Sequence, residues 1–287
     1  KYILRQKGKK IRPILVLLSA KLCGESTPRS YTAATLVEML HTATLIHDDV
    51  VDDAKTRRGL ASINAVWKNK IAVLMGDFML SRGLLLALEN DECGFLKITS
   101  RAVKRMSEGE LLQIQKNRKF DVNEETYFRI ISDKTASLIN ACCELGAAST
   151  SKDKNEVKLM GEFGENLGIA FQLRDDLLDY IGKKKIMGKS SGSDLKEKKF
   201  TLPLIHSLNN ASKKEAKDIV SLVKNGSYSK SRSIVMDFIK EHNGIEYTID
   251  KTTEYCATAK NNLQSFKPSE TKDTMIKFVD FISERVN

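Results

Sequence analysis

The sequence predicts an all-α protein built from long antiparallel helices. Apolar residues recur at three- and four-residue intervals through almost the whole chain, and no stretch alternates convincingly as a strand would. Only 4 prolines and 16 glycines interrupt 287 residues, so long helices can continue unbroken. Alanine-rich faces, such as the one that carries Ala141, Ala147 and Ala148, favour close packing between such helices.

The helical periodicity defines about ten segments along the chain. We expect helices over residues 11–23, 31–53, 71–89, 94–116, 123–149, 153–183, 200–208, 212–224, 228–240 and 246–284. Pro13 suits the start of the first helix, and Pro268 is expected to break the last one. The longest predicted loop, from Gly182 to Lys199, is rich in Gly, Ser and Lys.

No composition shift marks a domain boundary, so we expect a single domain over residues 1–287. The chain begins at Lys1 without a methionine, and we therefore expect its N-terminus to be truncated. We see no signal peptide and no apolar run of the roughly 18 residues that a membrane span needs. The five cysteines form no CxxC pair, which argues against a zinc site or a disulfide framework and favours a cytoplasmic protein.

Composition narrows the function only slightly. With 41% hydrophobic and 29% charged residues, the chain resembles an ordinary soluble globular protein. The formal charge of +10, from 47 Lys and Arg less 37 Asp and Glu, suggests anionic ligands but also fits nucleic acid or an acidic membrane surface. Aromatic residues make up only 7% and are not interleaved with basic stripes, which argues against nucleic acid.

A first cluster of carboxylates follows an apolar helical run. Asp48, Asp49 and Asp52 form a DDxxD arrangement, and spacings of one and four residues place them on one patch of a helix. Hard divalent ions such as Mg²⁺ accept carboxylate oxygens and keep further positions for water and phosphate. The alternative is a solvated acidic face, but the uncharged run from Met39 to Ile46 does not suit one.

The same pattern recurs in the second half of the chain. The stretch FQLRDDLLDY supplies Asp175, Asp176 and Asp179 at a closely matching spacing. Basic residues accompany both trios: Lys9, Lys10 and Arg12 precede the first, and Arg57 and Arg58 follow it. Arginine and lysine bind phosphate oxygens, so two trios with basic clusters predict a cage for several metal ions and a polyphosphate.

These motifs resemble those of the trans-polyprenyl diphosphate synthases, and the resemblance runs nearly end to end. It rests on KxxRP at Lys9 to Pro13, on the two DDxxD motifs, and on the pair Lys134 and Thr135. The resemblance implies an isoprenoid-synthase-type bundle of long antiparallel helices around a central cavity. It also implies head-to-tail condensation of isopentenyl diphosphate with an allylic diphosphate such as farnesyl diphosphate, about three Mg²⁺ per active site, a homodimer, and at most peripheral membrane contact.

The resemblance assigns roles residue by residue. The isopentenyl diphosphate clamp comprises Lys9, Arg12, His41 and Arg58. The allylic diphosphate is held by Arg57, Lys134, Thr135, Gln172, Lys189 and Lys199. The metal ligands are Asp48, Asp52, Asp175 and Asp179, and all six trio aspartates together with Lys134 are assigned to catalysis. Packing roles fall to Gly76, Asp77, Gly109, Glu110 and Gln113.

Two of these assignments have an alternative interpretation, and a third lies in a motif that departs from the family's pattern. A structural ion pair between Arg57 and Asp52 or Asp53 is compatible with the role of Arg57 as a ligand. His41 lies two helical turns before Asp48, but a lone histidine on an apolar helix is more often a core residue. The family's usual EGK reads Glu197, Lys198, Lys199 here, so a lysine replaces the glycine beside the expected ligand.

Product length is expected to depend on the residues before the first trio. The resemblance places a floor of aromatic residues there in short-chain enzymes, whereas this chain has the small residues Ala43 and Thr44. The run therefore looks most like octaprenyl-type synthases that make quinone side chains, with Met79 and Leu80 as candidates for a deeper stop. Alternatives are a geranylgeranyl or farnesyl synthase, a non-catalytic prenyl-binding subunit, and a terpene cyclase. Lys9, Arg12 and Arg58 argue against the cyclase.

Overall fold

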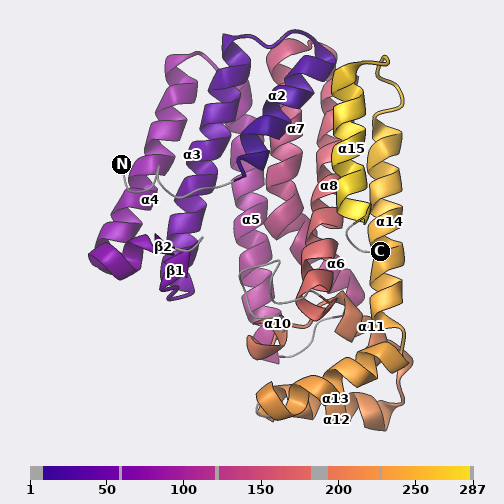
Figure 1. Ribbon diagram of the computed structural model, residues 1–287. Helices are drawn as coiled ribbons and strands as arrows, with labels where there is room; N and C mark the ends of the chain where they lie inside the picture. Colours follow the sequence, from indigo (N-terminus) through magenta and orange to yellow (C-terminus); the bar gives the residue numbers. More distant parts are fainter. Residues whose placement is uncertain (1–8, 58–59, 120–122, 182–192, 226–227, 285–287) are drawn as a thin grey trace. The chain divides into compact units, whose positions relative to one another are not determined.

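The computed structural model describes residues 9–57, 60–119, 123–181, 193–225 and 228–284, and these are almost entirely helical (Figure 1). The all-α prediction is therefore confirmed. The helices of the first half are α2 (Ile11–Cys23), α3 (Pro28–Val51), α4 (Ile63–Glu89), α5 (Cys93–Lys119), α6 (Glu124–Ile131), the π-helical turn η1 (Ser132–Ala136) and α7 (Ser137–Thr150). Those of the second half are α8 (Lys154–Ile181), α10 (Ser193–Lys196), α11 (Leu202–Asn210), α12 (Lys213–Asn225), α13 (Tyr228–Glu241), α14 (Gly244–Asn262) and α15 (Glu270–Glu284).

The described residues form two compact units. The N-terminal unit comprises Lys1–Arg101 and Ala141–Gly161, and the C-terminal unit comprises Ala102–Asn140 and Glu162–Asn287. Helices α5, α7 and α8 each contribute residues to both units. The expected single domain stays a prediction.

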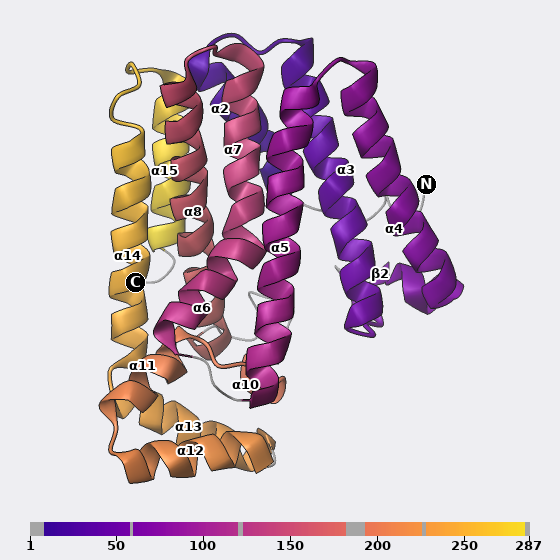
Figure 2. The same ribbon diagram turned by 180° about the vertical axis from the view of Figure 1, so that it is seen from behind.

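In the N-terminal unit, α3 packs along α4 on one side and on α2 on the other (Figures 1 and 2). Helix α3 begins at Pro28, a residue that suits a first helical position, and Thr27 N donates to Ser30 Oγ at 3.1 Å there. Leu15, Val16 and Leu36 are each at most 1% exposed and lie in the core of this unit. Gly146 of α7 must be small, because a Cβ atom there would lie 2.2 Å from the carbonyl oxygen of Val16.

Helix α4 begins earlier than the periodicity predicted. Ser62 caps its first turn by accepting a hydrogen bond from Ala65 N at 3.4 Å, and Lys68 then interrupts the helix with φ 67° and ψ 162°. The predicted start at residue 71 therefore missed a short turn before this kink. Ahead of the helix, β1 (Thr56–Arg57) and β2 (Leu60–Ala61) pair antiparallel, a hairpin that the sequence did not indicate.

The C-terminal unit is built around α8, α11 and α14. Its core includes Leu173, Leu177, Leu202 and Ile239, all fully buried. Helices α12 and α13 lie side by side beyond the ends of α11 and α14 (Figures 1 and 2). The predicted break near Pro268 is confirmed by the gap between α14 and α15.

Two features differ from the sequence-based expectation. The helix predicted over 123–149 is divided by η1, a turn with one more residue than an α-helical turn. Helix α4 meets the length and composition test for a membrane span, with a mean hydropathy of 1.8 and only 22% of the tested window buried. The expectation that no segment meets this test was wrong, although a single such helix is weak evidence because soluble proteins contain them too.

Candidate active site

The first aspartate trio lies at the C-terminal end of α3. Asp48 is exposed, Asp49 is 2% exposed, and Asp52 is the exposed C-cap residue. The hairpin that follows returns Arg57 to the helix, where its Nε donates to Asp49 Oδ1 at 2.6 Å. Asn64 adds a hydrogen bond from its amide to the carbonyl oxygen of Asp49 at 3.0 Å. The buried carboxylate is thus compensated by a cation, and the exposed ones face outward from the helix.

The partner of Arg57 differs from the alternative that the sequence offered. That alternative was an ion pair with Asp52 or Asp53, whereas the structure pairs Arg57 with Asp49, and Asp53 contacts Lys55 at 3.3 Å. Asp52 and Asp53 are both exposed, whereas Asp49 points into the interior. A buried carboxylate gains more from a cation than an exposed one does, because it has lost its hydration.

Two members of the predicted isopentenyl diphosphate clamp meet in the N-terminal unit. Arg12 Nη1 donates to His41 Nε2 at 2.9 Å. Lys10 pairs with Glu38, one turn before His41 on α3, and Lys9 is exposed next to it. Arg58 lies outside the described residues. The histidine is therefore held by an arginine from α2 rather than buried among apolar neighbours.

The second trio lies near the C-terminal end of α8. Asp175 is exposed, while Asp176 and Asp179 are each 5% exposed. Tyr127 donates its hydroxyl to Asp176 Oδ2 at 2.6 Å, and Gln172 donates its amide to Asp176 Oδ1 at 2.7 Å. Both oxygens of the middle carboxylate are therefore held by neutral donors.

Lys134 and Thr135 lie on η1 and face the second trio across one cavity. Thr135 Oγ1 donates to Gln172 Oε1 at 3.0 Å, which links the turn to Asp176 through the amide of Gln172. The cavity has a volume of about 210 Å³. Its polar lining includes Gln113, Lys134, Thr135, Gln172, Asp175, Asp176, Lys199 and Thr201.

Lys134 has an anionic partner on α5. It forms an ion pair with Glu110 and donates to Gln113 Oε1 at 2.7 Å. We assigned packing roles to Glu110 and Gln113, and the structure instead gives both a polar contact with Lys134. Lys199 pairs with Glu197 at 2.6 Å and also lines the cavity, whereas Lys189 lies outside the described residues.

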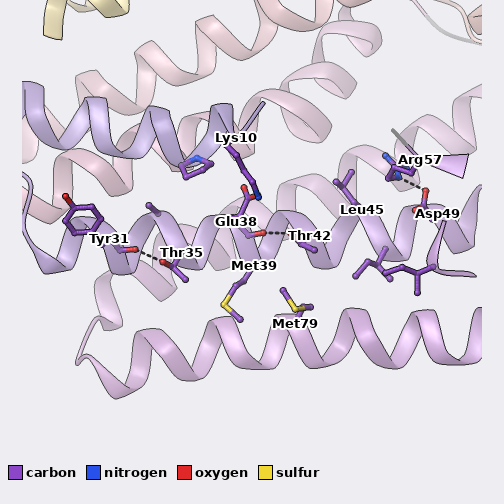
Figure 3. A pocket seen from close by; sticks show the side chains of 14 residues that line it. Lys10, Tyr31, Thr35, Glu38, Met39, Thr42, Leu45, Asp49, Arg57 and Met79 are labelled. Atoms are coloured by element: carbon purple, nitrogen blue, oxygen red, sulfur yellow. Dashed lines mark hydrogen bonds and ion pairs between the residues drawn. The ribbon is translucent and has the colours of Figure 1, made fainter. Parts of the chain in front are cut away.

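A second cavity runs along α3 in the N-terminal unit (Figure 3). Its volume is about 400 Å³, and it extends between α3 and α4 from Asp49 and Arg57 to Tyr31. Met39 and Met79 point into it from the two helices, as Figure 3 shows. Its other lining residues are Lys10, Pro13, Ala34, Thr35, Glu38, Thr42, Leu45, Ile46 and Ile63.

The residues expected to set product length lie on other faces of α3. Ala43 is 2% exposed, and Thr44 donates its hydroxyl to the carbonyl oxygen of His41 at 2.9 Å. Neither Ala43 nor Thr44 lines the cavity between α3 and α4. Of the two candidates for a deeper stop, Met79 lines this cavity and Leu80 does not. In the described N-terminal unit, this cavity therefore borders a different face of α3 from the one that carries Ala43.

Sequence reasoning missed Tyr127 and Asn64, which orient the two trios. Tyr127 is separated from Asp176 by 49 residues, so no local pattern could link them. Within the described ranges, no group of three or more His, Cys, Asp and Glu side chains is gathered closely enough to hold a metal ion by itself. All five cysteines are described, and none forms a disulfide, as their spacing predicted.

Known proteins resemble this chain over nearly its full length. A family model described as Polyprenyl synthetase matches residues 1–240. The octaprenyl diphosphate synthase of Escherichia coli is 34% identical over 284 residues, which are 99% of this chain and 88% of that protein. The geranyl-diphosphate-specific all-trans-nonaprenyl-diphosphate synthase of Rhodobacter capsulatus is 34% identical, over 100% of this chain and 88% of its own.

Solved structures agree with the sequence relatives. A decaprenyl diphosphate synthase from Rhodobacter capsulatus superposes with a TM-score of 0.93 at 33% identity, covering 100% of this chain and 88% of that chain. A polyprenyl synthase from Caulobacter crescentus, complexed with calcium and isoprenyl diphosphate, gives 0.90 at 32% identity with the same coverage. Other relatives are named heptaprenyl diphosphate synthase component 2 and short chain isoprenyl diphosphate synthase, at 32% and 30% identity. The chain therefore belongs to the trans-polyprenyl diphosphate synthase family and is a polyprenyl diphosphate synthase, a prenyltransferase with the all-α isoprenoid-synthase fold.

Proposed function

We propose that the enzyme condenses isopentenyl diphosphate head to tail with an allylic diphosphate such as farnesyl diphosphate. The product is an all-trans, medium- to long-chain, octaprenyl-like diphosphate for quinone side chains. The observation that carries the proposal is the cavity of the C-terminal unit, where Asp175 and Asp176 face Lys134, Thr135 and Lys199. Carboxylates beside lysines suit a metal-bound diphosphate, because a divalent cation held by the carboxylates would offset the repulsion between them and the phosphate groups.

The proposed cofactor is Mg²⁺, about three ions per active site. The exposed oxygens of Asp48, Asp52 and Asp175 fit a hard divalent cation that keeps water and phosphate ligands. Calcium in the Caulobacter crescentus structure is consistent with such a site. When bound, the metal would polarise the diphosphate so that the allylic carbon–oxygen bond can ionise.

The side chains of this enzyme supply the remaining steps. Lys134 and Arg57 stabilise the negative charge that develops on the departing diphosphate. Lys9, Arg12, His41 and Arg58 hold isopentenyl diphosphate so that its double bond attacks the allylic carbon. The new carbon–carbon bond replaces the carbon–oxygen bond, and a proton then passes from the condensed cation to the released diphosphate. We assign no side chain as the base.

A product assay with the purified enzyme tests this function. Labelled isopentenyl diphosphate is incubated with geranyl, farnesyl or geranylgeranyl diphosphate, and the dephosphorylated products are separated by length. We expect medium- to long-chain products with Mg²⁺ and none with a chelator. Products that stop at 15 or 20 carbons would favour the short-chain alternative.

No product from any primer would favour a non-catalytic prenyl-binding subunit instead. The relatives named heptaprenyl diphosphate synthase component 2 keep that second candidate open, because the word component implies another subunit. Fluorescence titration with farnesyl diphosphate would then detect binding without turnover. Condensation by the single purified chain would exclude this candidate.

The path of the growing chain can be tested on two faces of α3. Ala43→Phe places a ring on the buried face, and Met39→Phe places one in the cavity between α3 and α4. We expect Ala43→Phe to shorten the product by several isoprene units and to cost about 1–3 kcal/mol of stability through overpacking. Met39→Phe is the matched control and should leave product length unchanged. Shortening by Met39→Phe alone would place the chain in the cavity of Figure 3.

We also propose that the enzyme is a homodimer assembled through α4. After the kink at Lys68, large apolar side chains recur along this helix at intervals of three, four, seven and three residues and are exposed, with Leu74 at 55% and Phe78 at 57%. The stripe comprises Ile71, Leu74, Phe78, Leu85 and Leu88. Such spacing suits an antiparallel or crossed helix from a second copy, because it forms one continuous face.

Sedimentation tests the proposed dimer. The unmodified protein should sediment as a dimer at micromolar concentration, and a Leu74→Glu/Phe78→Glu variant should sediment as a monomer. Lys217→Glu is a control for added charge, since Lys217 is exposed on α12 rather than on the stripe of α4. A fully active monomer would contradict the proposal, and flotation of the unmodified protein with lipid vesicles would assign the stripe to a membrane surface.

A further inference from the structure

A group of charged side chains holds the π-helical turn that carries Lys134 and Thr135. Arg105 of α5 donates from Nε to Asp133 Oδ1 at 2.8 Å and from Nη2 to Ser132 Oγ at 2.8 Å. The same guanidinium binds Glu165 of α8 at two points, 3.0 Å from Nη1 and 2.7 Å from Nη2. We call Arg105, Ser132, Asp133 and Glu165 the Arg105 lock.

Two residues that Arg105 binds also contact each other. Ser132 Oγ donates to Glu165 Oε1 at 2.6 Å. The side chains of Arg105, Asp133 and Glu165 are 28%, 18% and 21% exposed, and their contacts are thus shielded from most of the solvent. Hydrogen bonding to Glu165, and then to Asp133, raises the pKa of Arg105 against the opposing effect of burial, which keeps the guanidinium charged.

The turn itself has little room to move. A Cβ atom on Gly109 of α5 would lie 2.8 Å from Lys134 N, and one on Gly168 of α8 would lie 2.6 Å from Ala136 Cα. Two glycines therefore let the backbone of η1 approach both helices. A π-helical turn is less favourable than α-helix and persists where its surroundings specify it. The lock ties the first two residues of η1 to the same two helices.

The position of η1 determines where the side chains of Lys134 and Thr135 lie. Lys134 reaches Gln113 and Glu110, both on α5, and Thr135 reaches Gln172 on α8. Their side chains line the cavity beside Asp175 and Asp176. A turn that lost its attachment would carry both groups away together, because they follow Asp133 directly in the chain.

We propose that Arg105 is a positioning residue for the allylic diphosphate: by holding Ser132, Asp133 and Glu165 it fixes η1 so that Lys134 and Thr135 face the second trio. The inference rests on the proposed role of Lys134 as a ligand of that diphosphate. Arg105 itself does not line the cavity and touches no reacting atom.

Arg105→Met tests the positioning role. The change keeps a long side chain but removes the cation that joins Asp133 to Glu165, and the exposed Arg129, 3.9 Å from Asp133 Oδ2, does not replace it, so η1 should shift. We expect the KM for the allylic diphosphate to rise about 10- to 100-fold, because small displacements of positioning groups have effects of that size. The KM for isopentenyl diphosphate should stay within about two-fold of its original value. Glu165→Gln keeps the shape of the partner and should raise the same KM less.

Arg101→Met is the matched control. Arg101 lies one turn earlier on α5 and binds both oxygens of Glu144 at 2.7 and 2.5 Å, but it is 59% exposed and belongs to the N-terminal unit. Removing this pair should leave both KM values unchanged. The comparison therefore separates loss of an ion pair on α5 from loss of the attachment of η1.

A double-mutant cycle with Lys134→Ala decides whether Arg105 acts through Lys134. Lys134→Ala alone should raise the KM for the allylic diphosphate, and adding Arg105→Met should raise it little further. Fully additive effects would overturn the proposal, as would an Arg105→Met enzyme that loses thermal stability with unchanged KM. An unchanged KM in Lys134→Ala would instead refute the proposed ligand role of Lys134. If Arg105→Met does not fold, Glu165→Gln takes its place in the cycle.

Discussion

The two aspartate trios share a spacing but differ in how their middle carboxylate is held. In both, the first aspartate is exposed and the second is buried, as Asp48 and Asp49 and as Asp175 and Asp176. Arg57, a cation, binds Asp49, whereas the neutral donors Tyr127 and Gln172 bind Asp176. The third aspartates differ as well, since Asp52 is exposed and Asp179 is buried.

The difference teaches that one motif can be supported in two ways. In the first trio, Arg57 offsets the charge of the buried carboxylate of Asp49. In the second trio, hydrogen bonds from Tyr127 and Gln172 fix the direction of both oxygens of Asp176. Loss of the cation should therefore cost more stability than loss of one neutral donor.

The largest expected effect is loss of turnover when either exposed first aspartate is removed. Asp48→Ala and Asp175→Ala should each lower kcat by about 1,000-fold or more, because metal binding supplies several kcal/mol of transition-state stabilisation. Helix content measured by circular dichroism should not change. Asp53→Asn is the control, since Asp53 is an exposed neighbour with φ 46°, a conformation that asparagine accepts. Near-normal turnover in both alanine variants would refute a role for the trios in catalysis.

The next effect is on the free energy of unfolding. It compares the ion pair that holds Asp49 with the neutral donors that hold Asp176. Arg57→Met strands a buried carboxylate without its cation and should lower the free energy of unfolding by about 3 kcal/mol. Tyr127→Phe removes one of two neutral donors to Asp176 and should cost about 1–2 kcal/mol. Urea unfolding of each variant measures both values. The opposite order would mean that the neutral donors contribute more than the ion pair and that the comparison drawn above is wrong.

A smaller effect is expected at alkaline pH. Desolvation by burial raises the pKa of Cys142 in the N-terminal unit from 9.0 to about 12. In the C-terminal unit, burial and then the hydrogen bond to Glu124 raise the pKa of Tyr247 from 10.0 to about 12. The unfolded chain releases these protons first, so the free energy of unfolding should be unaffected below pH 9 and should fall as pH rises toward 12. Urea titrations from pH 7 to pH 11 test the sign, and a rise in stability would contradict it.

The smallest effect is expected in the order in which the thiols are labelled, which reports how readily each unit opens. Cys93 is exposed, whereas Cys142, Cys143 and Cys256 are buried. Cys93 should react with a maleimide first in the folded protein, and the buried thiols should react only on unfolding. Mass spectrometry of timed digests would identify the order. Early labelling of Cys256 would indicate that the C-terminal unit opens more readily than the N-terminal one.

The helices were largely predictable because their apolar periodicity is local. The first helix was predicted over 11–23 and is observed at Ile11–Cys23, and the break near Pro268 is found between α14 and α15. The start of α4 was missed because the kink at Lys68 interrupts the periodicity there. The turn η1 was missed because the close approach to Gly109 and Gly168 that it requires is tertiary.

The candidate site was predictable as a set of residue types but not as a set of contacts. The spacing of the trios indicated the carboxylates, and the resemblance to the family indicated Lys134. Nothing local distinguished Asp49 as the partner of Arg57, since burial rather than distance along the chain selects it. Tyr127 had no sequence signal, because its role depends on a helix 49 residues away.

The extra residue in η1 has a consequence for how this chain tolerates insertions and deletions. Each residue of an α-helix advances the side-chain direction by about 100°, so an additional residue in a regular helix would rotate everything that follows by that amount. The wider turn of η1 absorbs such a residue and keeps α7 in register with its neighbours. Deleting a single residue between Ser132 and Ala136 would narrow this turn to α-helix and change the directions of Lys134 and Thr135. Deletions elsewhere in exposed loops would have no such effect. We therefore expect homologues to vary in length at loop positions while keeping the residue count of this turn fixed.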